Sequence, residues 1–170
     1  MSVLLVGANP GLTVQRDGAT VAFVSLWRVD WSPHGAGRAI VLWHEGRTAV
    51  VTATPVLGRW LAGTFTRHFP EVEGLPWPEP AVTQAPVTFE LDLAAGCTGA
   101  GGGVEVALRG PSGHRLITVD AFQGQDLNLS TVYAKCAEGT LTVAGRTVPG
   151  TAAGFLADAE VWTSAPAARP

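Results

Sequence analysis

The last predicted strand of the chain carries two carboxylates that could perform acid–base chemistry. Along residues 155–163, strict alternation places Asp158 and Glu160 on one face together with Trp162. In a wide barrel this face would line the lumen, where the carboxyl groups could orient an apolar ligand or act as general acid and base with pKa values raised by burial. In a narrow barrel the opposite, small-residue face would pack the core and water would solvate the acids.

Aromatic side chains are the second group of candidates. Six tryptophans in 170 residues is a high content, and large amphipathic rings line both cores and ligand pockets. The rings on predicted strands and on the predicted helix form the expected ligand-binding set: Trp27, Trp43, Trp60, Tyr133 and Trp162. Each of them is also a candidate for the hydrophobic core.

The sequence predicts neither a metal site nor a cofactor. The four histidines and two cysteines form no His-Glu-x-x-His or Cys-x-x-Cys pattern. The glycine-rich residues 94–103 resemble a phosphate loop in composition, but they lack a following helix and a Gly-Lys-Ser/Thr sequence. We therefore expect a flexible hairpin loop there, with a lid over a pocket as the alternative.

A three-stranded meander is predicted from residues 87–93, 104–109 and 114–122, with the glycine-rich loop joining the first two strands. This pairing would place Leu91 opposite Val106 and Asp92 opposite Glu105. Opposed carboxylates could mark a metal site or a pair with one raised pKa, but the polar face of an antiparallel sheet usually meets water. A solvated outer face is the simpler interpretation.

One helix is predicted, over about 55–69. Thr54 suits the N-cap, Pro55 suits the first helical position, and Pro70 ends the helix. Apolar residues recur at every fourth position along one face: Leu57, Leu61, Phe65 and Phe69. Gly58 belongs to a second stripe of small residues, which predicts the close approach of a neighbouring strand.

Short apolar or alternating runs with frequent turns fill the rest of the chain. They predict a mainly β protein: an antiparallel β-barrel, or a strongly curved sheet, of roughly ten strands with one central helix. We expect a single domain over residues 1–163 and a disordered tail over residues 164–170.

Composition limits the partners and the location. The net charge is −3 and Lys135 is the only lysine, so nucleic-acid binding is disfavoured. The N-terminus has no basic segment and only a short apolar run, which predicts a cytoplasmic protein with no membrane partner. Cys97 and Cys136 are then expected to be reduced.

We do not recognise a family whose motifs these residues match. The expected architecture alone is similar to that of lipocalin-like barrels, whose glycine-x-tryptophan signature is absent near the first strand. The leading hypothesis is a cofactor-free protein that binds a small, largely apolar molecule. The alternatives are an enzyme acting on such a molecule (a cyclase, isomerase or hydratase), with Asp158 or Glu160 as acid or base, and a structural homodimer whose barrel is filled with side chains.

Overall fold

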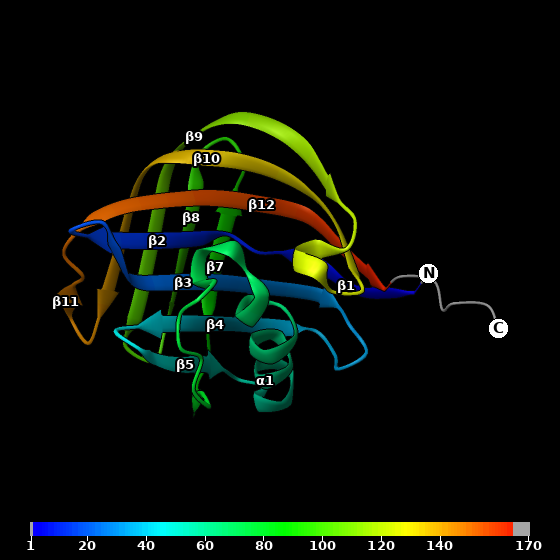
Figure 1. Cartoon of the computed structure of the whole chain (residues 1–170), viewed down its shortest axis with the longest axis horizontal. Coiled ribbons are helices and arrows are strands. Elements are labelled where there is room, and N and C mark those ends of the chain that lie inside the picture. The colour runs from blue at the N-terminus through cyan, green and yellow to red at the C-terminus, as the bar shows by residue number, and fades with distance from the viewer. Residues whose placement is uncertain (1, 165–170) are drawn as a thin grey trace.

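The computed structural model describes residues 2–164, and it shows a mainly β protein built on one strongly curved sheet (Figure 1). The sheet has twelve strands, in the order β6-β5-β4-β3-β1-β12-β10-β9-β8-β7, with β2 beside β3 and β12 and with β11 beside β10. The strands are β1 (Val3–Ala8), β2 (Gly11–Arg16), β3 (Ala19–Trp31), β4 (Gly37–His44), β5 (Arg47–Thr52), β6 (Ala81–Gln84), β7 (Thr88–Asp92), β8 (Gly96–Gly101), β9 (Val104–Val119), β10 (Leu127–Val143), β11 (Arg146–Thr147) and β12 (Thr151–Ser164).

The sheet curls back on itself without closing by hydrogen bonds. Neighbouring strands are antiparallel except for β5 and β6, which are parallel, and the end strands β6 and β7 do not pair with each other in the described chain. The curl is closed by packing instead, because a Cβ added at Gly102 would lie 2.9 Å from the Val51 side chain of β5.

Side chains fill the concave side of the curl. Strands from both halves of the sheet contribute to this core, including Leu12, Leu26, Leu108 and Leu141, which are all essentially inaccessible to solvent. Cys97 and Cys136 are buried in the same core as free thiols, and burial raises the pKa of Cys97 to about 12. The interior of the curl is therefore a packed core rather than a wide lumen.

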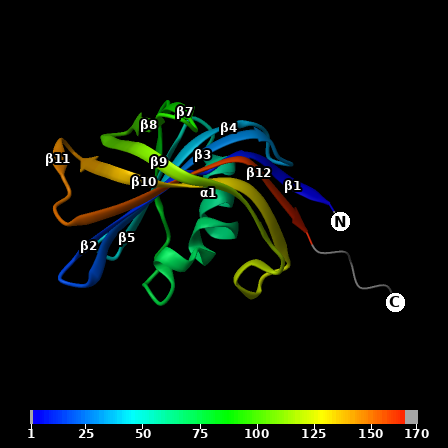
Figure 2. The ribbon, with the colours of Figure 1, turned by 90° about the horizontal axis from the view of Figure 1, so that it is seen from above.

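The helix covers the outer face of the sheet rather than its centre. Helix α1 (Pro55–Thr64) packs on β4 and β5, on the side away from β7 and β8 (Figure 2). A second core, the outer-face core, lies between the helix and the sheet and contains Trp27, Leu57 and Phe65. As the small-residue stripe predicts, the helix approaches a strand closely at Gly58, where a Cβ would lie 2.6 Å from the Thr52 side chain.

The helix begins where it is predicted to begin but ends earlier. After Thr64 the chain continues as two 3₁₀ turns, η1 (Thr66–His68) and η2 (Pro70–Val72). Thr66 is fully buried, and its hydroxyl bonds to side chains of β3. The turns draw Phe69 and Val72 into the outer-face core.

The predicted glycine-rich loop is wrong. Its central part is strand β8, which pairs Cys97 with Leu91 of β7 and Ala100 with Glu105 of β9. The glycines here permit close packing, since a Cβ at Gly99 would lie 2.9 Å from Leu26 across the core. Because β8 separates β7 from β9, Asp92 does not lie opposite Glu105.

Strand β9 also differs from the prediction, because residues 104–119 form one strand instead of two joined by a turn. No helix within residues 2–164 is both long enough and apolar enough to span a bilayer. Of the predicted tail, Ser164 ends β12 and the rest lies outside the described residues.

Candidate functional site

A β-bulge in β12 determines which side chains reach the site. Ser130 of β10 pairs with Val161 and Val132 pairs with Asp158, so β12 carries one extra residue at this point. Ala159 takes up the bulge with a left-handed backbone, at φ 48°. Beyond the bulge the alternation of faces is reversed.

The predicted sharing of a face by Asp158, Glu160 and Trp162 is therefore wrong. Glu160 and Trp162 lie on the same face as Phe155 and Ala157 and line a cavity with them, whereas Leu156 packs into the concave core. Asp158 accepts a hydrogen bond at 2.9 Å from the Arg28 guanidinium and another from the Ala159 amide. It stabilises the bulge from outside the cavity.

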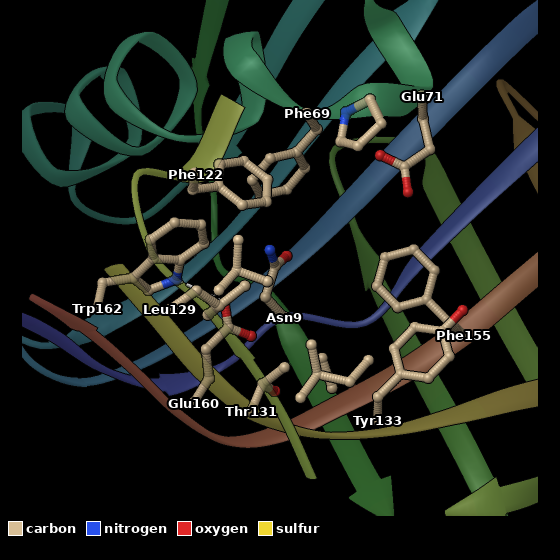
Figure 3. A pocket seen from close by; sticks show the side chains of 14 residues that line it. Asn9, Phe69, Glu71, Phe122, Leu129, Thr131, Tyr133, Phe155, Glu160 and Trp162 are labelled. Carbon is tan, nitrogen blue, oxygen red and sulfur yellow. Dashed lines mark hydrogen bonds between the residues drawn. The ribbon is translucent and has the colours of Figure 1, made fainter. Parts of the chain in front are cut away.

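The cavity lies on the same side of the sheet as the helix. The ends of β9 and β10 bend toward the helical segments there (Figure 2), and a 3₁₀ turn, η3 (Phe122–Gly124), covers one end. Its volume is about 240 Å³, and its lining is almost entirely apolar. The lining residues are Asn9, Phe69, Pro70, Glu71, Ile117, Val119, Phe122, Leu129, Thr131, Tyr133, Phe155, Ala157, Glu160 and Trp162 (Figure 3).

Glu160 is the most unusual group in the cavity. It is only 2% exposed, and the Trp162 indole N–H donates a hydrogen bond of 2.5 Å to its Oε1. Burial raises the pKa of Glu160 to about 8, the nearby Asp158 charge acts in the same direction, and the Trp162 hydrogen bond opposes both. Glu160 is thus a neutral carboxylic acid at pH 7, and its Oε2 has no hydrogen-bond partner within residues 2–164.

Asn9 is the second buried polar group, at 3% exposed. Its backbone N–H bonds to the carbonyl of Ala157 at 2.9 Å, and its side-chain Oδ1 accepts a hydrogen bond of 2.7 Å from Ser25. The Ser25 hydroxyl accepts from Thr66 at 3.4 Å, and the Thr66 hydroxyl accepts from the Trp27 indole at 3.1 Å. Because Ser25 donates to the Asn9 Oδ1, the Asn9 amide nitrogen has no partner within residues 2–164, and Asn9 lines the cavity.

Tyr133 and Phe155 form the other end of the cavity, with their rings stacked at 5.4 Å between centroids. The half-buried Glu71 extends from η2 toward them (Figure 3). Burial raises the pKa of the Glu71 carboxyl, and burial together with the Glu71 charge raises the pKa of the Tyr133 hydroxyl. The cavity therefore has one carboxyl group at each end.

The structure brings together only part of the predicted ligand-binding set. Tyr133 and Trp162 line the cavity with Glu160. Trp27 lies in the outer-face core against Phe65, at 5.6 Å between ring centroids. Trp43 donates its indole N–H to the carbonyl of Pro76, and Trp60 packs against His34.

The sequence pattern does not reveal several lining residues. Asn9 precedes a proline and a glycine, which is typical of a turn, and the bulge that brings Phe155 onto the face of Glu160 and Trp162 is not visible in the sequence. Glu71 carries no signal in the sequence, because only the 3₁₀ turn after the helix aims it at β10.

Comparison of the chain with protein-family models, with curated proteins and with solved structures finds no match. Within residues 2–164, no group of three or more His, Cys, Asp or Glu side chains is arranged to hold a metal ion. The chemistry of the cavity is the basis for assigning a function.

Proposed function

We propose that the protein binds a small, largely apolar molecule in the cavity between η2, η3 and strands β9, β10 and β12. The observation that supports this most directly is an apolar cavity of about 240 Å³ into which two buried polar groups, Glu160 and Asn9, project. Ligand sites in proteins are typically apolar concavities with a few polar groups that fix orientation. An apolar cavity of roughly 150 Å³ holds benzene, so a bicyclic hydrocarbon skeleton is a suitable size.

Filling the cavity is expected to abolish binding. Ala157 lies at its floor and is buried, so Ala157→Leu would occupy the space a ligand needs. Tetralin is a suitable probe, and we expect its affinity to fall at least tenfold in this variant. The measurement is the saturable shift of the Trp162 indole N–H signal in NMR spectra, identified with Trp162→Phe.

Ala153→Leu is the matched control, because Ala153 lies on the same strand but is exposed and lines no part of this cavity. It should bind tetralin like the wild type. Equal binding by Ala157→Leu and the wild type would place the ligand elsewhere. If the protein is instead a structural homodimer, it should not bind tetralin, and light scattering should give the mass of a dimer.

An enzyme that moves a proton within such a molecule, as an isomerase does, is the second candidate. The observation that favours it is the pair of carboxyl groups facing one cavity, with Glu160 deeply buried and Glu71 at the mouth. A carboxyl group with a pKa near the working pH is suited to both donating and accepting a proton. Deuterium incorporation from heavy water into a bound probe, lost in Glu160→Gln, would support this activity.

A further inference from the structure

Asn9 and Glu160 are neighbours on the floor of the cavity. Gly7 of β1 pairs with Glu160 of β12, and the Asn9 N–H bonds to Ala157 of the same strand. The bulge at Ala159 puts Ala157 and Glu160 on one face. Glu160 therefore enters the cavity from β12, and Asn9 enters it from the position directly after the neighbouring strand β1 (Figure 3).

Each of these side chains presents a hydrogen-bond donor to the cavity. The Asn9 amide nitrogen is available because the chain through Ser25, Thr66 and Trp27 engages the amide oxygen. On Glu160, Oε1 accepts from the Trp162 indole, which leaves the acid proton on Oε2. Neither donor has a protein acceptor within residues 2–164.

We propose that the ligand carries a carbonyl oxygen, such as that of a cyclic ketone, and that this oxygen accepts hydrogen bonds from both Asn9 and Glu160. A carbonyl oxygen has two lone pairs and no hydrogen, so it satisfies two converging donors at once. Buried donors that a ligand leaves unpaired cost affinity, and the site thus discriminates against a pure hydrocarbon. This inference rests on the proposed function, since it specifies the ligand of the same cavity.

The charges around Glu160 favour its neutral form. On its own strand, Asp158 is acidic, and the Arg28 of β3 that neutralises it lies on the opposite face. From η2 the group facing the cavity is Glu71, and from β10 it is Tyr133. No described cation lines the cavity, and the Trp162 hydrogen bond, which favours an ionised Glu160, is outweighed by burial.

The test compares three probes of one shape: 1-tetralone, tetralin and the cationic 1-aminotetralin. At pH 6.5 the wild-type protein should bind 1-tetralone about tenfold more tightly than tetralin. Without donors in the cavity the order would be reversed, because the ketone loses more hydration than the hydrocarbon. Raising the pH above 8 should weaken the binding of 1-tetralone and leave the binding of tetralin unchanged.

Two variants separate the donors. Glu160→Gln keeps a donor but cannot ionise, so binding of 1-tetralone should become independent of pH. Asn9→Leu removes the second donor and should reduce the preference for 1-tetralone severalfold, and the wild-type comparison is decisive even if this variant does not fold.

Equal affinities for tetralone and tetralin, or tightest binding of 1-aminotetralin, would overturn the carbonyl inference while the proposed function stands. Failure of all three probes to bind would overturn both.

Discussion

The free energy of unfolding of the wild-type protein is expected to fall by as much as about 5 kcal/mol as the pH rises from 4.5 to above 8, and Glu160→Gln should remove most of this dependence. The pKa of Glu160 is about 8 in the folded protein against an ordinary 4.5. Between these values the folded protein holds a proton that the unfolded chain has released. The unfolded state thus binds fewer protons, and stability decreases as the pH rises. Urea unfolding monitored by circular dichroism at several pH values measures the slope.

Two other groups contribute to the same profile and serve as controls. Burial raises the pKa of Glu71, so Glu71 acts in the same direction as Glu160, and Glu71→Gln should flatten the curve only slightly because this side chain is less buried. Burial lowers the pKa of His68, which destabilises the fold as the pH falls through 6.5 and opposes the trend. An unchanged slope in Glu160→Gln would show that Glu160 is ionised in the folded protein at neutral pH.

The curved sheet and the start of the helix follow from local patterns in the sequence. Pro55 and the apolar period of four specify the helix, and Gly58 correctly predicts its contact with a strand. The end of the helix is not local, because Thr66 leaves the helical path to bond with Ser25 and Trp27, which are far away in the sequence. Tertiary contacts of this kind override helical periodicity.

The glycine-rich residues show the same limit in the sheet. Glycine is uncommon in strands, so residues 94–103 were predicted as a loop. In the structure Gly99 and Gly101 are strand residues that allow close approach to Leu26 and Val51 of the facing half of the sheet. The whole curled sheet determines which residues face these glycines, so the neighbouring sequence does not reveal the contact.

The set of residues that line the cavity also depends on a feature that the sequence does not show, the bulge at Ala159. Strict alternation predicts Glu160 and Trp162 as site residues, but it also groups Asp158 with them. No glycine marks the bulge at Ala159 in the sequence. The Asp158 carboxylate, which accepts a hydrogen bond from the Ala159 amide, is its only local sign. One extra residue exchanges the two faces, so Glu160 and not Asp158 is the acid of β12 that lines the cavity.

Gly7→Ala is expected to destabilise the protein by about 3 kcal/mol or more and to weaken binding of 1-tetralone in any folded fraction. A Cβ at Gly7 would overlap the carbonyl oxygen of Arg28 in β3, and backbone on both sides prevents an easy shift. Since Gly7 also pairs with Glu160, moving β1 away from β3 would disturb the two donors together. Gly63→Ala in α1 is the control: a Cβ there meets nothing within 4 Å, and alanine should stabilise the helix by about 1 kcal/mol. Urea unfolding of the three proteins measures both effects, and wild-type stability in Gly7→Ala would show that β1 does not approach β3 as closely as this site requires.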